Sequence, residues 1–153
     1  MDSITKLSFT LKIRGYISLL KLRLSSLVVL SAFFGFLLAD GNLTSYIFLN
    51  LILGGVLITG SSNGFNQIIE HKTDELMSRT FSRPLPSKVL SIPEALIFCI
   101  ITGVLGLYLL ASINFSSFIL GLLAMVIYTV IYTPLKKITP FAVFVGAIPG
   151  SIP

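Results

Sequence analysis

Long runs of apolar residues restrict this sequence more than any single motif does. Four runs, at residues 20–39, 46–69, 93–111 and 117–132, come close to the length of about 20 residues that an α-helix needs to cross a bilayer. Only 11% of the 153 residues are charged, and the mean hydropathy is +0.96, far above that of soluble domains. Because backbone polar groups in lipid must be paired internally, the sequence predicts an all-α, polytopic transmembrane helix bundle.

A fifth apolar run begins at Pro140 and continues to Pro153. It is shorter than a spanning helix, so we expect four complete spans and a truncated fifth. Residues 1–153 then form a single membrane domain, which we expect to be incomplete and inactive alone. The one cysteine, Cys99, lies in an apolar run, which excludes both a disulfide framework and a cysteine-based metal site.

The basic residues are confined to three segments. All eleven lysines and arginines lie in the N-terminal arm, after the second apolar run or after the fourth. Lysine and arginine concentrate in cytoplasmic loops, so we expect these three segments to be cytoplasmic and the turns at Asp40 and Asn114 to face outward. The sequence thus predicts a multi-pass protein of the bacterial inner (cytoplasmic) membrane, with its N-terminus and its functional loops in the cytoplasm.

The polar segment 63–87 interrupts this apolar pattern. If the second helix continues through it, Asn66, Glu70 and Asp74 follow at four-residue steps and share one helix face. Two carboxylates about 6 Å apart repel by roughly 3 kcal/mol at an effective dielectric constant near 20, so nearby cations must offset their charge. Magnesium prefers oxygen ligands and binds through one or two carboxylates and substrate phosphates. We therefore predict Asn66, Glu70 and Asp74 as catalytic residues and as Mg²⁺ ligands.

A solvated helix end with intrahelical ion pairs is the alternative for this strip. The small and polar residues from Gly60 to Gly64 immediately precede it, within a segment apolar enough for lipid. Such residues favour a face that looks into a cavity. His71 stands alone in the polar end of this helix, where a solvated or hydrogen-bonded side chain is the ordinary role.

Basic residues on the same side of the membrane are candidate ligands for a diphosphate: Lys21, Arg23, Arg79, Arg83, Lys136 and Lys137. Acidic metal ligands ringed by cations suit an allylic diphosphate, because the cations stabilise the leaving group as an allylic carbocation forms. Snorkelling to the headgroups is the alternative for Lys21 and Arg23. The nearby aromatic residues, Phe65, Phe81, Tyr128 and Tyr132, are candidates to stabilise the carbocation, with core packing as the alternative.

The segment NQIIEHKTDELMSRTFSRPLP resembles the first signature of the UbiA-type intramembrane prenyltransferases, in the form carried by the branch that acts on protoheme IX. The residues that match are Asn66, Glu70, Asp74, Met77, Arg79, Thr80, Arg83 and Pro84. The stretches LLKLRLSSLVVLSAFFGFLLA and YTPLKKITPFAVFVGAIPGSIP extend the similarity over most of the chain.

The resemblance implies the N-terminal half of a bundle of about nine helices. It also implies Mg²⁺-dependent transfer of the farnesyl group of farnesyl diphosphate to a vinyl group of heme b, which makes heme O. The implied partners are these two substrates and the lipid bilayer, with no nucleic acid. The sequence departs from the family pattern at Leu22, where a proline is usual, and at His71, where a strongly basic residue is common. The family's second acidic motif is not present in this chain.

Two other functions remain open at this point. A related prenyltransferase with a quinone-type aromatic acceptor would share the diphosphate chemistry. A non-catalytic membrane subunit or transporter half would share only the helices. Transporters place ionisable groups near the bilayer midplane, whereas the charges here lie toward one end of each span, which disfavours transport.

Overall fold

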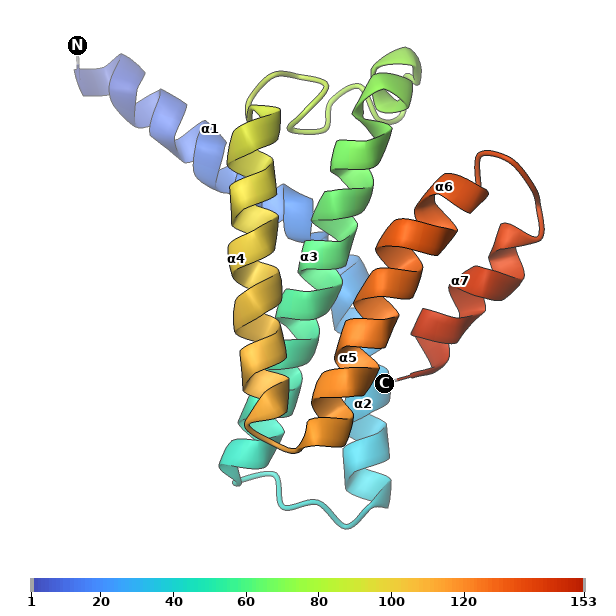
Figure 1. The fold of residues 1–153 in the computed structure, drawn as a ribbon. Coiled ribbons are helices and arrows are strands. Elements are labelled where there is room, and N and C mark those ends of the chain that lie inside the picture. The colour runs from blue at the N-terminus through green and yellow to red at the C-terminus, as the bar shows by residue number, and fades with distance from the viewer. Residues whose placement is uncertain (1, 153) are drawn as a thin grey trace.

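The computed structural model describes residues 2–152, and their side chains from residue 9 onward. Every regular element in this part of the chain is helical. The elements are α1 (Asp2–Leu20), α2 (Leu22–Leu38), α3 (Tyr46–Leu76), α4 (Ile92–Ala111), α5 (Phe115–Val126), the π-helical turn η1 (Ile127–Tyr132), α6 (Thr133–Leu135) and α7 (Ala142–Ser151). Figure 1 shows α3 at the centre, with α5, η1 and α6 running as one rod and α7 folded back along it.

The helices confirm the predicted polytopic bundle. Three of them are long and apolar enough to cross a membrane: α3, α4 and the continuous rod from Phe115 to Leu135. A fourth crossing is formed if residues 9–20 and helix α2, which meet at a 40° bend, are taken as one broken span. The fifth apolar run forms only the ten-residue helix α7. The protein is therefore a multi-pass helical membrane protein.

The three basic segments meet at one end of the bundle, as the charge pattern predicted. Helix α1, the connection between α3 and α4, and the connection between α6 and α7 all lie at the upper end in Figure 1. The two turns without basic residues, after α2 and after α4, lie at the lower end. We call these the basic end and the opposite end of the bundle.

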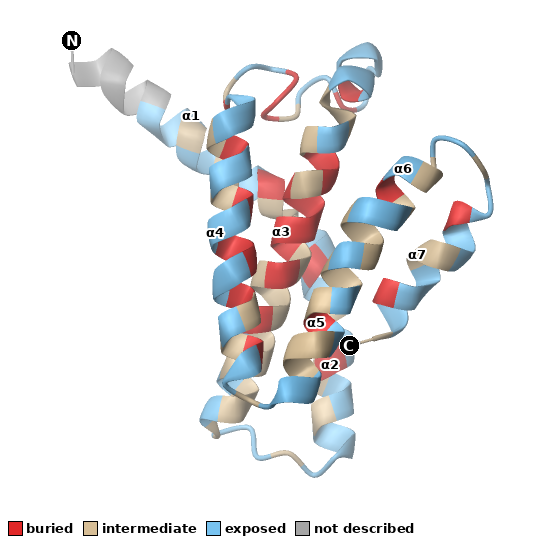
Figure 2. Cartoon of the chain, in the orientation of Figure 1, coloured by how far each residue is buried: buried red, intermediate tan, exposed pale blue. Residues whose placement is uncertain are grey.

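Helices α3 and α4 pack closely because glycines face each other. A Cβ atom added at Gly106 would lie 3.0 Å from the Ile58 backbone nitrogen and 3.1 Å from the Gly54 carbonyl oxygen. Without a hydrophobic drive between helices in lipid, such close approach of backbones is a main source of helix association. Figure 2 shows the buried residues gathered along α3 and the face of α4 toward it, while outward positions such as Ile101 and Val104 are exposed.

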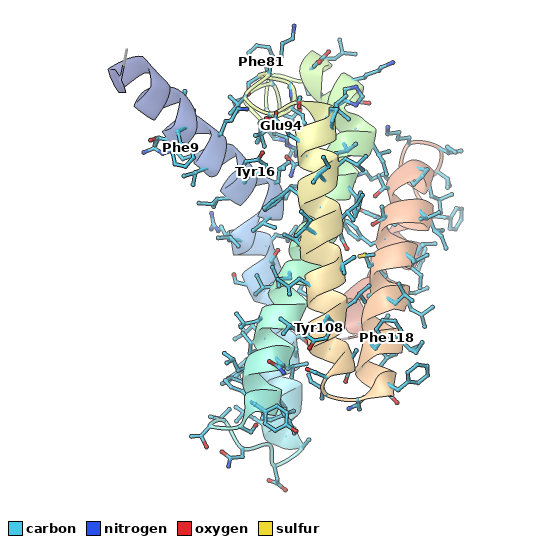
Figure 3. The ribbon with its side chains drawn as sticks, turned by 60° about the vertical axis from the view of Figure 1, so that its left-hand side comes forward. Phe9, Tyr16, Phe81, Glu94, Tyr108 and Phe118 are labelled. Atoms are coloured by element: carbon cyan, nitrogen blue, oxygen red, sulfur yellow. The ribbon has the colours of Figure 1, made fainter. Side chains whose placement is uncertain are left out.

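The connection between α3 and α4 folds over the basic end. Leu85 and Leu90 pack with Leu19 of α1 and Ala95 of α4 in one buried cluster. Ser91 caps α4 in a capping box with Glu94, which satisfies two otherwise unpaired amides. Figure 3 shows Glu94 near Tyr16, where α1 passes α4. Glu94 also pairs with the Lys12 ammonium at 2.5 Å, which ties α1 to this end.

Candidate active site

The last turns of α3 carry the predicted acidic strip. Helix α3 continues without interruption to Leu76, so Asn66, Glu70 and Asp74 lie on successive turns. Asn66 and Asp74 are buried, with exposed fractions of 2% and 4%, and Glu70 is half-buried. An amide and two carboxylates therefore sit in a largely dehydrated place, where charges interact more strongly than in water.

Asp74 is paired with the connection that follows α3. Its Oδ2 atom accepts a hydrogen bond from Arg83 Nη1 at 2.6 Å. The buried Thr80 hydroxyl donates to the Asp74 carbonyl oxygen at 2.9 Å, which turns the chain back over the helix end. The segment from Asp74 to Arg83 thus forms a loop, which is closed by the ion pair between the Arg83 guanidinium and the Asp74 carboxylate.

Glu70 and Asn66 both contact Lys136, which lies at the C-terminal end of α6. Lys136 Nζ lies 2.9 Å from Glu70 Oε1 and 3.0 Å from Asn66 Oδ1. The fully buried Thr133 hydroxyl lies 3.1 Å from the same Asn66 oxygen and 2.8 Å from the Tyr128 carbonyl oxygen. The π-helical turn just before Thr133 shifts the helix register, and such turns are frequent at functional sites.

Lys21 joins the cluster from the break between α1 and α2. It is half-buried and forms no ion pair within 4.0 Å in the described part of the chain, but it lies near enough to Glu70, Asp74, Arg83 and Lys136 for their charges to act on its own. The expected repulsion within the acidic strip is therefore offset by cations from three other parts of the chain. We call the six residues Lys21, Asn66, Glu70, Asp74, Arg83 and Lys136 the charged cluster.

Three predicted diphosphate ligands lie outside the charged cluster. Arg23 and Arg79 are exposed, and neither side chain makes a hydrogen bond or ion pair within the described residues. Arg23 lines a groove at the break together with Lys21, Leu22 and Leu27. Lys137 is exposed and its Nζ atom lies 3.4 Å from the Ile69 carbonyl oxygen. All three remain at the basic end, but only side-chain movement would bring them to the acids.

The aromatic and histidine candidates also differ in whether they lie near the charged cluster. Tyr128 and Tyr132 lie together, with ring centroids 5.2 Å apart, and Lys136 Nζ is 5.4 Å from the Tyr132 ring centroid. Phe81 is 61% exposed on the connection after α3. His71 Nδ1 lies 2.8 Å from the Ile68 carbonyl oxygen, one turn back on its own helix, which fits a locally hydrogen-bonded side chain.

The oxygen donors of the cluster fit a magnesium ion only together with other ligands. Among the residues described here, no three acidic, histidine or cysteine side chains gather closely enough to hold a metal ion. Asn66, Glu70 and Asp74 nevertheless present amide and carboxylate oxygens on successive turns. Magnesium typically takes one or two carboxylates and completes its shell with water and phosphate oxygens, so these residues suit a magnesium ion that arrives with a diphosphate.

Sequence reasoning missed several polar residues that hold the cluster. Thr133 contacts Asn66, Gln67 Nε2 donates to the Leu19 carbonyl at 3.0 Å, and the Ser25 hydroxyl donates to the Leu20 carbonyl at 2.8 Å. All three are buried. The sequence could have indicated them, because each is a polar residue within or next to an apolar segment. A buried polar group there is costly unless it is hydrogen-bonded.

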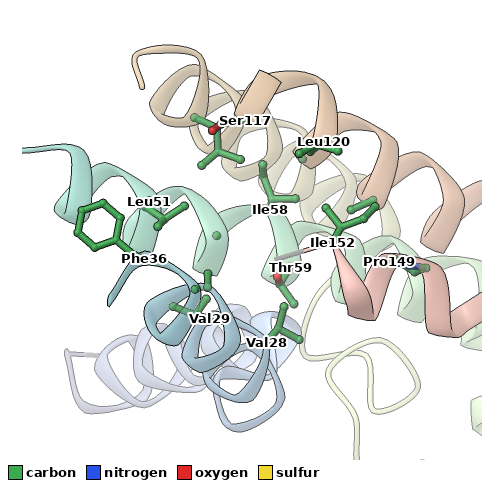
Figure 4. A pocket seen from close by; sticks show the side chains of 16 residues that line it. Val28, Val29, Phe36, Leu51, Ile58, Thr59, Ser117, Leu120, Pro149 and Ile152 are labelled. Atoms are coloured by element: carbon green, nitrogen blue, oxygen red, sulfur yellow. The ribbon is translucent and has the colours of Figure 1, made fainter. Parts of the chain in front are cut away.

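An apolar cavity lies between α2, α3, α5 and α7 (Figure 4), and its α3 wall residues, from Leu51 to Thr59, precede Asn66 along the helix. It has a volume of about 330 Å³, and its walls include Val28, Ile58 and Pro149. A second cavity of about 160 Å³ shares these three wall residues and reaches Asn63 and Tyr128. The two cavities are therefore neighbours, and the smaller one reaches Asn63, one turn before Asn66 on α3.

The fold and the cluster together define a multi-pass membrane protein with paired acids and cations at one end and an apolar cavity between its helices. The chain belongs to the UbiA prenyltransferase family, whose model matches residues 28–153.

Named relatives narrow the branch of the family. The chain is 43% identical over 142 residues to the protoheme IX farnesyltransferase of Cytophaga hutchinsonii, an alignment that covers 92% of this chain and 50% of the relative. It is 44% identical over 133 residues to that of Christiangramia forsetii, covering 87% and 44%. The mitochondrial protoheme IX farnesyltransferase of Arabidopsis thaliana is 40% identical over 144 residues, covering 92% and 33%.

The chain thus spans about half the length of the curated bacterial relatives it matches. No solved structure matches the chain.

Proposed function

We propose that this chain supplies the diphosphate-binding side of a farnesyl transfer to protoheme IX, which makes heme O. The observation that carries the proposal is the charged cluster, in which Asp74 and Glu70 are each neutralised by a cation from another element. The names of its relatives support heme as the acceptor, because the relatives from Cytophaga hutchinsonii, Christiangramia forsetii and Arabidopsis thaliana are all named protoheme IX farnesyltransferase.

The ion pairs of the cluster suit an exchange of partners. Asp74, Glu70 and Asn66 are the residues that would hold Mg²⁺ once farnesyl diphosphate draws their cations away, and the bound ion would supply positive charge to offset the diphosphate. Arg83 and Lys136, until then paired at 2.6 and 2.9 Å, turn to the phosphate oxygens. Charge-assisted hydrogen bonds to phosphate are strong, so each cation keeps an anionic partner throughout.

The cations then stabilise the leaving group. As the C–O bond of the allylic diphosphate breaks, negative charge grows on the diphosphate, and Lys21, Arg83 and Lys136 lie around it. Preorganised positive charge of this kind in a dehydrated site is a large contribution to catalysis. The faces of Tyr128 and Tyr132 stabilise the allylic cation. One carbon of the heme vinyl group forms the new C–C bond to this cation, which leaves a cation on the adjacent vinyl carbon. Solvent water adds there and loses a proton, so that the diphosphate leaves, a C–C bond and a C–O bond form, and the charge balances.

The apolar cavity suits the isoprenoid chain. Its walls are hydrocarbon side chains of α2, α3 and α5, and the smaller cavity continues to Asn63 and Tyr128, next to the charged cluster. An isoprenoid chain placed there buries its apolar surface while its diphosphate reaches Lys136. Binding sites of this kind are mostly apolar, with a few polar groups that set orientation.

We place the charged cluster on the cytoplasmic side of the bacterial inner membrane. The support is that all basic segments meet at one end of the bundle and that such segments stay in the cytoplasm. In intact cells, a cysteine at Lys88 is expected to be protected from an impermeant thiol reagent, and one at Asn42 to react. The reverse pattern would refute this orientation.

The test of the function is heme O formation. Membranes that contain the protein, expressed from its complete gene, are supplied with heme b, farnesyl diphosphate and Mg²⁺, and hemes are identified by mass spectrometry. Heme O is the expected product, and chelation of Mg²⁺ is expected to abolish it. Prenylation of a quinone-type aromatic acceptor without heme O formation would overturn the proposed acceptor.

A further inference from the structure

The break between α1 and α2 sets the position of Lys21. Lys21 has a φ angle of 45° and a ψ angle of 54°, in the left-handed region that costs a side-chain-bearing residue about 1–2 kcal/mol. The sequence has Leu22 here, so no proline enforces the break. Interactions with other residues must therefore stabilise the 40° bend between the two helices.

Two buried side chains donate hydrogen bonds to backbone carbonyls at this break. The Leu24 amide donates to the Lys21 carbonyl at 2.8 Å, so it no longer serves the Leu20 carbonyl four residues back. The Ser25 hydroxyl donates to that Leu20 carbonyl at 2.8 Å. The Gln67 amide group of α3 donates to the Leu19 carbonyl at 3.0 Å. An unpaired buried carbonyl costs about 1–3 kcal/mol, so these bonds favour the broken geometry over a straight helix.

The same side chains connect the break to the acidic strip. Gln67 directly follows Asn66 on α3, and the Asn63 side-chain nitrogen lies 3.4 Å from the Ser25 hydroxyl. Ser25, Asn63 and Gln67 are exposed by at most 2%. The network therefore ties the backbone around Lys21 to the helix that carries Asn66, Glu70 and Asp74.

We propose that Gln67 and Ser25 are positioning residues that hold the left-handed break at Lys21 and thereby direct its ammonium group into the diphosphate site. This inference rests on the proposed function for its kinetic consequence, but the geometry of the break does not depend on it. A straight helix through residue 21 would rotate the following residues relative to α3, and the ammonium group of Lys21 would change its position relative to Glu70 and Asp74, whose charges act on it.

The first test is kinetic. The variant that combines Gln67→Met with Ser25→Ala removes both donors with little change in volume, and Ser26→Ala is the control, since the exposed Ser26 hydroxyl bonds only to the Arg23 carbonyl. We expect the double variant to raise KM for farnesyl diphosphate by about tenfold, the loss of one charge-assisted hydrogen bond, and Ser26→Ala to leave it unchanged. In a Lys21→Met background the double substitution is expected to add nothing further.

The second test needs no turnover. A cysteine replaces Lys21, and its rate of reaction with a water-soluble maleimide is measured in the reconstituted protein. We expect the rate to change at least about fivefold when Gln67→Met and Ser25→Ala are added, and not when Ser26→Ala is added. Unchanged labelling, or a KM effect that persists in full without Lys21, would overturn the positioning role. Absence of turnover in the unmodified protein would instead refute the proposed function, and the labelling ratio would still decide this inference.

Discussion

The two halves of α3 are held in different ways. The half toward the opposite end packs against α4 through Gly54 and Gly106, where backbone meets backbone. The half at the basic end carries Asn66, Glu70 and Asp74, which are bound by hydrogen bonds and ion pairs to α6 and to the connection before α4. One uninterrupted helix is thus held by close backbone packing in one half and by ion pairs and hydrogen bonds in the other.

This difference separates stability from function along one helix. Glycine contacts fix how closely two backbones approach and tolerate no added atom, but they carry no charge that a substrate would need. Ion pairs of the charged cluster have partners that a diphosphate and its metal can replace. Substitutions in the first half should therefore mainly affect folding, and substitutions in the second half should mainly affect turnover.

The largest effect is expected for the acidic strip. Asp74→Asn keeps the shape of the side chain and removes a charge that the metal needs, so heme O formation per folded protein should fall by about a thousandfold, or roughly 4 kcal/mol in the activation barrier. Glu75→Gln is the control, because Glu75 is exposed on the same helix turn. Equal activity of the two variants would show that Asp74 serves only its ion pair with Arg83.

A smaller effect, on stability, is expected at the glycine contact. Gly106→Ala places a methyl group 2.8 Å from Ile58 Cγ1 and 3.0 Å from the Ile58 backbone nitrogen, and overpacking of this kind costs about 1–3 kcal/mol. Gly35→Ala is the control, because nothing lies within 4 Å of a Cβ atom there. Unfolding in detergent should separate the variants, and equal midpoints would contradict the role given to the α3–α4 contact.

The smallest effect is expected for a polar contact at the opposite end. Asn50 Nδ2 donates to the Ser112 hydroxyl at 2.8 Å in an exposed position. Ser112→Ala should change the free energy of unfolding by less than about 0.5 kcal/mol, as surface substitutions usually do, and should leave turnover unchanged. A loss comparable to that of Gly106→Ala would show that polar contacts stabilise both halves of α3.

Much of the fold could be predicted from the sequence, because the lengths of the apolar runs and the positions of lysine and arginine can be read locally along the chain. The helical membrane bundle, the shared basic end and the common face of Asn66, Glu70 and Asp74 were predicted and confirmed by the structure. In the described residues, the predicted four complete spans are reached only if the bent pair at residues 9–38 is taken as one span. The helical N-terminal arm and the break at Lys21 were not, since no proline or glycine marks them.

The pairing within the site was harder to predict. Arg79 and Arg83 are equally plausible from their spacing, but the Thr80 hydrogen bond turns only Arg83 toward Asp74. Lys136 and Lys137 are adjacent, and the register set by η1 decides which of them reaches Glu70. Both choices depend on tertiary geometry rather than on local pattern.

The most direct test of the central claim is the affinity for farnesyl diphosphate when Lys136 is changed. In the reconstituted protein with Mg²⁺, Lys136→Met should weaken binding by about 10- to 100-fold, since charge-assisted hydrogen bonds contribute roughly 1.5–3 kcal/mol. Lys72→Met, an exposed lysine on the last turns of α3, should bind within about twofold of the unmodified protein, as expected for a substitution at the surface. Equal affinity of both variants and the unmodified protein would contradict the assignment of the charged cluster as the diphosphate site.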